Sequence, residues 1–394
     1  MSTSSNPPTD LQFIGRGIIP GRSWWRSESD ELPCLAPLPS GSESGLLPLG
    51  HPGAYEAGSD LIDAVNTALL LRKPLIITGR PGTGKTELAE RVAYEFDLGA
   101  VLRFEAQSLS EANDLFYRFD YIAQLVASKL VESGQAKPED AGVMNFVQWG
   151  PLGHAILRSA PMQRHALEAA PPTRPPRYLK LRPMSAEMAA QASAAPPELA
   201  APRRSVVLID EIDKASRDFP NDLLNGIDRM EFRLRECNSR VVRGAGRDSP
   251  FHPIVIVTSN SERDLPHPFM RRCVFVHIQD PDRDQLAAIV RKRVFGNLDA
   301  APAGQDGLPA LYARLLDVFL NLRDTGELRY PIGTSELLDF TTAVLRRGLD
   351  GKEAVVSTVE PLINSAGALI KHADDRAYIT SQLQSLAVPM TVPK

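Results

Sequence analysis

The sequence predicts an α/β protein whose parallel sheet is sandwiched by helices, followed by an all-helical C-terminal region. Three observations support this prediction. The apolar run Leu75–Thr78 leads into a glycine-rich loop and then into a helix-like pattern. The run Ser205–Ile209 is short and rich in β-branched residues, as fully buried parallel strands are. From about Asp280 onward, apolar residues such as Leu286 and Val290 recur at helical spacing.

The glycine-rich loop from Gly79 to Thr86 matches the complete phosphate-binding pattern G-x-x-x-x-G-K-[ST]. Its glycines let backbone N–H groups turn toward phosphates, and the N-terminus of the next helix adds its positive dipole end. Lys85 is expected to reach the β- and γ-phosphates, and the Thr86 hydroxyl to hold Mg²⁺. The predicted ligands are therefore ATP and Mg²⁺, and the predicted ATP contacts are Gly79, Arg80, Pro81, Gly82, Thr83, Gly84, Lys85 and Thr86.

Two carboxylates follow the second predicted strand, at Asp210 and Glu211. In open α/β sheets, ligands sit at the carboxyl ends of the strands. We expect Asp210 to complete the Mg²⁺ site with Thr86, and Glu211 to orient and polarise the water that attacks the γ-phosphate. The alternative is that one of the two acids only caps the next helix.

A third strand-like run, Ile254–Thr258, ends near Asn260, whose amide is expected to contact the γ-phosphate or the attacking water. Arg271 and Arg272 then precede another strand-like run, Val274–Ile278. Paired arginines at such a place are either surface charge or arginine fingers that reach the γ-phosphate of a neighbouring subunit.

These motifs, in this order, resemble those of AAA+ ATPases of the MoxR type. The resemblance extends from about Tyr55 to Asp350 and includes Trp149–Gly153 and the strand and helix at Ile209–Leu224. Thr258–Pro266 and the Arg-Arg-Cys sequence at 271–273 resemble a MoxR branch found in bacterial conflict gene clusters.

The resemblance implies an AAA+ core with a C-terminal helical lid, assembled as a ring that is usually a hexamer. It implies that Glu211, Asn260, Arg271 and Arg272 take part in ATP hydrolysis, and that a protein is remodelled. The usual partner in this group carries a von Willebrand A-type domain. The lid departs from the family pattern at one position. Glu336 occupies the place where related lids supply an arginine, and Arg329 is the nearest basic replacement.

The predicted domains are a flexible N-terminal segment at 1–50, an ATPase core at 51–280 and a helical lid at 281–394. A crossover helix needs on the order of a dozen residues, but the interval between Ala106 and Ser205 is far longer, so it holds an insertion. Within it, 107–157 is predicted to be helical, with Leu115, Phe119, Ile122 and Val126 in the core. The stretch 158–204 is Pro-, Ala- and Arg-rich and predicts a solvated linker, or alternatively a nucleic-acid contact.

Two smaller features complete the pattern. Residues 231–250 predict a hairpin whose arginines face either a central pore or plain solvent, with Phe232 as a gripping side chain. In the N-terminal segment, Ile18–Trp25 is the expected docking spot. It either folds back on this subunit or binds a partner, because adjacent tryptophans are costly to leave in water.

Composition excludes few functions. The net charge of −4 over 394 residues argues neither for nor against nucleic acid, and no helix-turn-helix or zinc-finger spacing occurs. Three scattered cysteines and the lack of a long apolar run predict a cytoplasmic protein without a membrane span. We expect an ATPase acting on protein partners. The alternatives are a slow nucleotide-gated switch in a defence complex and a nucleic-acid motor.

Overall fold

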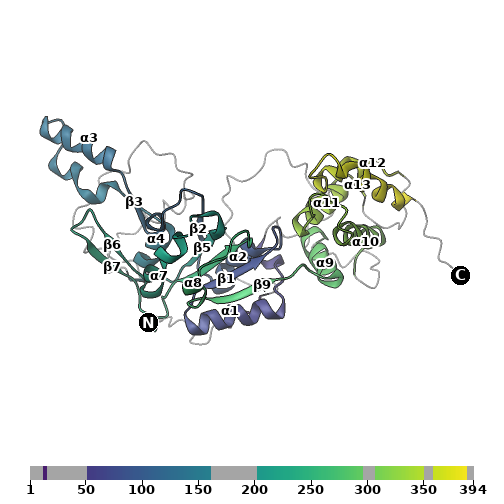
Figure 1. Ribbon diagram of the computed structural model, residues 1–394, viewed down its shortest axis with the longest axis horizontal. Helices are drawn as coiled ribbons and strands as arrows, with labels where there is room; N and C mark the ends of the chain where they lie inside the picture. The colour runs from purple at the N-terminus through teal and green to yellow at the C-terminus, as the bar shows by residue number, and fades with distance from the viewer. Residues whose placement is uncertain (1–11, 16–50, 161–201, 296–306, 350–357, 388–394) are drawn as a thin grey trace, which may run out of the picture.

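The computed structural model describes residues 12–15, 51–160, 202–295, 307–349 and 358–387. Figure 1 shows an α/β part built around a sheet and, beside it, a cluster of helices at the C-terminal end. The predicted docking spot at Ile18–Trp25 and most of the predicted linker at 158–204 lie outside the described residues. Within the described ranges, none of the helices combines the length and the apolar character needed to cross a membrane.

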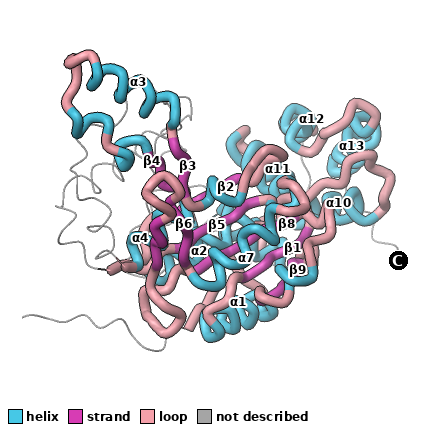
Figure 2. Tube along the Cα trace, turned by 60° about the vertical axis from the view of Figure 1, so that its left-hand side comes forward, coloured by secondary structure: helices cyan, strands magenta, loops and turns pink. Residues whose placement is uncertain are grey.

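The central sheet confirms the predicted parallel architecture. Its five strands are ordered β2-β5-β8-β1-β9, and every neighbouring pair is parallel. Buried side chains fill the three central strands β5, β8 and β1 because helices cover both faces of the sheet (Figure 2), whereas the outer strands β2 and β9 also carry exposed residues. The strands are β1 (Leu75–Gly79), β2 (Leu102–Glu105), β5 (Val206–Asp210), β8 (Ile254–Ser259) and β9 (Val274–Ile278).

The two faces of the sheet have separate apolar cores. On one face, α1 (Ser59–Leu71) and α2 (Lys85–Phe96) pack against side chains such as Leu75 and Ile77. On the other face, α4 (Pro151–Ser159) and α7 (Phe219–Arg229) pack against the alternate side chains of the same strands. Successive strand side chains point to opposite faces, which is why one apolar run supplies both cores.

The insertion between β2 and β5 differs from the predicted helix over 107–157. Its described part contains an antiparallel pair, β3 (Tyr117–Phe119) and β4 (Val147–Trp149), joined through α3 (Tyr121–Glu132). Asp120 caps α3 by accepting the N–H of Ala123 at 2.8 Å, so the helix begins after the strand.

The side chains predicted to lie on one buried face of a helix are therefore partly buried in the core and partly exposed to solvent. Leu115 is fully buried, but Ile122 is 78% exposed and Val126 is 53% exposed. A strand separates Leu115 from α3, so helical spacing does not carry through, and the predicted core role of Ile122 and Val126 is wrong. Figure 1 shows α3 projecting away from the sheet.

The predicted hairpin is confirmed by the antiparallel pair β6 (Glu231–Leu234) and β7 (Arg240–Arg243). Phe232, however, is only 6% exposed, because it packs against the rings of Phe116, Tyr117 and Trp149. It anchors the hairpin to the insertion, so its predicted role as an exposed gripping side chain is wrong.

The C-terminal region is helical and has its own apolar core, as predicted. Leu286, Leu315, Phe319 and Leu337 all belong to this core. After the short helix α8 (His267–Met270) and β9, the helices are α9 (Arg283–Val290), a π-helical turn (Arg291–Phe295), α10 (Ala310–Asp324), α11 (Thr334–Arg346), α12 (Glu360–Ser365) and α13 (Asp375–Gln384). We refer to these helices from α9 onward as the lid.

The described N-terminal residues 12–15 correct the prediction of a segment that is flexible apart from Ile18–Trp25. Phe13 is completely buried and belongs to the core formed by α1 and α2. The exact limits of the three predicted domains stay a prediction.

Candidate functional site

The strand order places the three predicted motifs side by side. The strand β8 lies between β1 and β5, and all three run in the same direction. Their carboxyl ends therefore lie together at one end of the sheet. The glycine loop follows β1, Asn260 follows β8, and Asp210–Glu211 stand at the end of β5.

Lys85 lies inside the glycine loop, at the start of α2. Its Nζ atom donates to the carbonyl oxygens of Gly79 at 2.7 Å and of Arg80 at 2.8 Å. Gly84 precedes it with a φ of 84°, and a Cβ atom there would lie 3.2 Å from the ring of Tyr55. Only glycine adopts this conformation without strain, so the sequence of the loop matches its shape.

The ammonium group of Lys85 is close to several carboxylates. Burial lowers the pKa of Lys85, while the negative charges of Asp213, Asp210 and Glu211 oppose that effect. A buried cation next to backbone carbonyls is positioned to exchange those oxygens for phosphate oxygens.

The tip of the loop faces the lid. Thr83 Oγ1 donates to the carbonyl of Arg80 at 2.8 Å, and the Arg80 guanidinium turns outward to Asp280 at 2.8 Å. A Cβ atom on Gly82 would lie 2.4 Å from Ser335 Oγ, and one on Gly333 would lie 3.1 Å from the carbonyl oxygen of Pro81. The start of α11 therefore covers the loop at close range.

The predicted metal ligands lie together. Thr86 Oγ1 is 3.2 Å from Asp210 Oδ2, and the hydroxyl of Thr258 donates to Asp210 Oδ1 at 2.5 Å. Hydroxyl and carboxylate oxygens are the donors that Mg²⁺ takes in phosphate sites. These residues fit a magnesium ion bound next to the phosphates held by Lys85.

Both carboxylate oxygens of Glu211 accept a hydrogen bond from a neighbouring side chain. Asn260 Nδ2 donates to its Oε1 at 3.1 Å, and Lys214 Nζ lies 2.5 Å from its Oε2. The backbone of Glu211 is left-handed, with φ 54°, and its N–H donates to Thr258 Oγ1 at 2.9 Å. A non-glycine residue in this region costs roughly 1–3 kcal/mol, and such strain concentrates at functional sites.

Two residues of this site were not singled out from the sequence. Asp213 is 3% exposed and accepts the backbone N–H groups of Asn260 at 3.2 Å and of Glu262 at 3.1 Å. It thereby fixes the turn that carries Asn260. Thr258 links Asp210 to Glu211. The sequence contains a signal for each of them: Asp213 is a third acid two positions after Glu211, and Thr258 is a hydroxyl residue near the end of an apolar strand.

Arg271 and Arg272 lie at the opposite end of the sheet, where the parallel strands begin. They precede β9, where Val274 donates to the carbonyl of Pro74 at the start of β1, whereas the glycine loop follows the end of β1. Arg272 Nε binds Asp228 at 2.5 Å. The Arg271 side chain is exposed and makes no hydrogen bond or ion pair with the residues that the structure describes. Neither arginine is placed near the glycine loop of its own chain.

Glu336 and Arg329, the two residues that mark the departure from related lids, both make contacts within the lid. Glu336 Oε2 accepts the N–H of Gly333 at 2.9 Å and the hydroxyl of Ser335 at 3.0 Å, and Oε1 lies 3.6 Å from Lys371. Lys371 is the basic partner expected on a neighbouring element, but Gly333 and Ser335 lie against the glycine loop, so the expectation that Glu336 points away from the loop is not confirmed. Arg329, the expected basic replacement, instead binds Asp374 at 2.9 Å. That side chain turns toward α13, so the replacement contact is not formed.

A second contact joins the lid to the core near Tyr55. Lys292 of the π-helical turn forms an ion pair with Glu56. Burial, together with the charge of Glu87, raises the pKa of the Tyr55 phenol, which therefore stays protonated. The short segment around Tyr55 thus contacts both the glycine loop and the lid.

Comparison with known families agrees with this geometry. The family model described as AAA domain (dynein-related subfamily) matches residues 74–273, a range that contains the glycine loop, Asp210–Glu211, Asn260 and both arginines. A search of the curated proteins found no match to this sequence.

Proposed function

This chain belongs to the AAA domain family, dynein-related subfamily, and from that premise we propose that it is a MoxR-type ATPase that works as a ring on protein partners. The AAA domain is a domain of ATPases. The observation that carries the proposal is the convergence of Thr86 with Asp210 and of Asn260 with Glu211 beside the buried Lys85.

Each residue has a distinct task in the proposed reaction. Lys85 releases the loop carbonyls and binds the β- and γ-phosphates of ATP, while Thr86 and Asp210 hold Mg²⁺, which would neutralise charge on the phosphates. Glu211 orients a water and accepts its proton as the water attacks the γ-phosphate. Asn260 keeps the Glu211 carboxylate directed at that water.

The position of the arginines supports a ring. Phosphoryl transfer in ATPases is accelerated by a cation supplied to the γ-phosphate, often from a neighbouring subunit. Arg271 stands across the sheet from its own glycine loop and has an exposed side chain. We therefore assign Arg271 to the neighbour's nucleotide and Arg272 to holding α7 through Asp228. The hexamer rests on the MoxR resemblance.

The surface next to the hairpin supports a protein partner. Arg233, Arg235 and Arg240 are exposed on the hairpin. A cavity of about 880 Å³ lies beside them and is lined in part by Phe116, Asn225 and Arg233. The projecting α3 adds exposed apolar side chains, which favour protein contacts over nucleic acid. A von Willebrand A-type partner and a defence role rest on the MoxR resemblance.

A slow nucleotide-gated switch is the second candidate. The observation that favours it is the ion pair between Lys214 and Glu211, which occupies the carboxylate oxygen that Asn260 leaves available. Hydrolysis by Glu211 then requires this pair to open, and opening becomes a control point.

The proposal is tested by phosphate release from ATP by the full chain, with Mg²⁺ and with a chelator. We expect magnesium-dependent release that rises more than in proportion to protein concentration, because turnover needs neighbouring subunits. Chelator-resistant release, or release that is proportional to protein at all concentrations in a monomeric sample, would contradict the proposal.

A further inference from the structure

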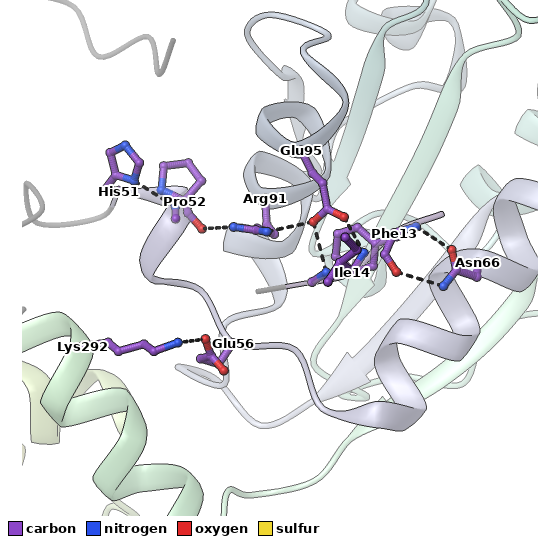
Figure 3. Close-up of polar contacts among 11 residues, drawn as sticks. Phe13, Ile14, His51, Pro52, Glu56, Asn66, Arg91, Glu95 and Lys292 are labelled. Carbon is purple, nitrogen blue, oxygen red and sulfur yellow. Dashed lines mark hydrogen bonds and ion pairs between the residues drawn. The ribbon is translucent and has the colours of Figure 1, made fainter. Parts of the chain in front are cut away.

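The described N-terminal residues Gln12–Gly15 are held on the ATPase core mainly through their backbone (Figure 3). Asn66 of α1 accepts the N–H of Phe13 with Oδ1 at 2.8 Å and donates from Nδ2 to the carbonyl of Phe13 at 3.1 Å. This is the paired donor and acceptor pattern that a neighbouring β-strand would offer. Asn66 thus recognises an extended backbone, whatever the side chains are.

Glu95 of α2 continues the same recognition. Its carboxylate accepts the N–H groups of Ile14 and of Gly15, the latter at 3.1 Å. Arg91, which is completely buried, binds the same carboxylate with Nε at 3.1 Å and Nη2 at 2.9 Å. A buried carboxylate needs several donors, and the docked segment supplies two of them.

Two side chains give the site sequence preference. Phe13 is completely buried, and its ring lies 6.4 Å from the ring of Phe96. Gly15 has a φ of 74°, and a Cβ atom there would lie 2.7 Å from the Cβ of Ala57. Ile14, between them, is 56% exposed. The site therefore accepts an aromatic residue, then a residue of broad choice, then glycine.

The same residues reach toward the nucleotide site. Arg91 Nη1 donates to the carbonyl of Pro52 at 3.3 Å, and the segment that follows carries Tyr55, which contacts Gly84, and Glu56, which pairs with Lys292 of the lid. The docked residues thus support the segment that joins the glycine loop to the lid (Figure 3).

We propose that α1 and α2 form a peptide-binding site for an extended aromatic-x-glycine segment, and that Gln12–Gly15 is its tethered ligand. Phe13, Gly15 and Asn66 lie outside the range 74–273 that matches the AAA domain, whereas Arg91 and Glu95 lie within it. The contacts are those of a bound peptide, with backbone recognition by Asn66 and Glu95 and one aromatic anchor.

The test is peptide binding in the absence of nucleotide, so its outcome does not depend on the proposed ATPase. A fluorescent peptide with the sequence of residues 9–18 is added to a chain that lacks residues 1–15, and anisotropy is recorded. We expect saturable binding. A tethered ligand acts at an effective concentration on the order of millimolar, so the full chain should bind the same peptide at least about tenfold more weakly.

Two variants of the full chain make the test specific. Gly15→Ala should release the tethered segment and allow the added peptide to bind, while Ile14→Ala, altered at an exposed side chain, should keep the site closed. Peptides that carry the Phe13→Ala or Gly15→Ala change should not bind the truncated chain.

Three results would overturn the proposal. The first is no saturable binding to a folded truncated chain and a folded Gly15→Ala chain. The second is equal binding by the unmodified full chain. The third is that the truncated chain and the Gly15→Ala chain both fail to fold by circular dichroism, since residues 12–15 would then be an integral part of the core rather than a displaceable ligand.

Discussion

The side-chain amide of Asn260 donates to the carboxylate of Glu211, with Nδ2 and Oε1 3.1 Å apart. These residues follow neighbouring parallel strands, β8 and β5, and meet at the end of the sheet that carries the glycine loop. The other oxygen of the same carboxylate is bound by Lys214. One carboxylate is therefore held between an amide that directs it and a cation that restrains it.

Removing the cation should release Glu211. The pair between Lys214 and Glu211 is partly exposed, and such pairs contribute about 0–1 kcal/mol. Lys214→Ala should therefore raise the steady-state ATPase rate by at most about fivefold, because 1 kcal/mol corresponds to that factor. Lys137→Ala, which removes an exposed pair with Glu139, is the matched control and should leave the rate unchanged. A lower rate in Lys214→Ala would show that Lys214 assists the reaction.

The two arginines before β9 should behave differently. Arg271→Ala should lower ATP turnover by about 10³-fold or more without weakening ATP binding, as expected for an arginine finger. Arg272→Ala removes the ion pair with Asp228 and should mainly cost about 0–1 kcal/mol of stability.

Mixing experiments separate action on a neighbour from action within one chain. Arg271→Ala chains mixed with Lys85→Ala chains should regain part of the turnover, because an intact Arg271 then faces an intact glycine loop. Full activity of an Arg271→Ala chain, or of a protein that sediments as a monomer with ATP, would refute the assignment.

The exposed arginines of the hairpin should serve a partner rather than ATP. Replacing Arg233, Arg235 and Arg240 with alanine should leave basal ATPase activity within about twofold, since surface changes of this kind have small effects. Arg346→Ala on the lid is the control. Neither single- nor double-stranded DNA should stimulate the unmodified protein. Strong, salt-sensitive stimulation by DNA that disappears in the triple variant would instead identify a nucleic-acid motor.

His252 should make the fold sensitive to acid. Burial lowers its pKa to about 4, and its Nδ1 lies 3.4 Å from the carbonyl of Ala245. The unfolded chain binds a proton below its ordinary pKa near 6.5, whereas the folded chain does so only near pH 4. Stability is therefore lost as the pH falls from about 6.5 to 4, by up to about 3 kcal/mol. Urea unfolding should show a flatter profile for His252→Gln over this range, and an unchanged profile would contradict the argument.

The sequence allowed the sheet, the glycine loop and the placement of Asp210, Glu211 and Asn260 to be predicted, because each follows an apolar run whose direction in a parallel sheet is fixed. It did not reveal the exposure of Ile122 or the burial of Phe232. Both depend on how the insertion packs against the hairpin, and the spacing of apolar residues within one segment does not contain that information.

The docked residues around Phe13 were missed for a related reason. Four residues are too short for a periodic pattern, and their partners Asn66 and Glu95 look like ordinary helix surface until the tertiary structure joins them. In the lid, the capping role of Glu336 follows from its position three residues after Gly333, but the turn of Arg329 toward Asp374 depends on contacts between distant helices.

The central claim is that Glu211 activates water in a site where Lys85 binds the phosphates. Comparing ATP binding with single-turnover hydrolysis for Glu211→Gln and Lys85→Ala tests it most directly. Glu211→Gln should bind ATP as the unmodified chain does and hydrolyse it on the order of 10²–10⁴-fold more slowly. Lys85→Ala should fail to bind. Hydrolysis by Glu211→Gln at the unmodified rate would contradict the account.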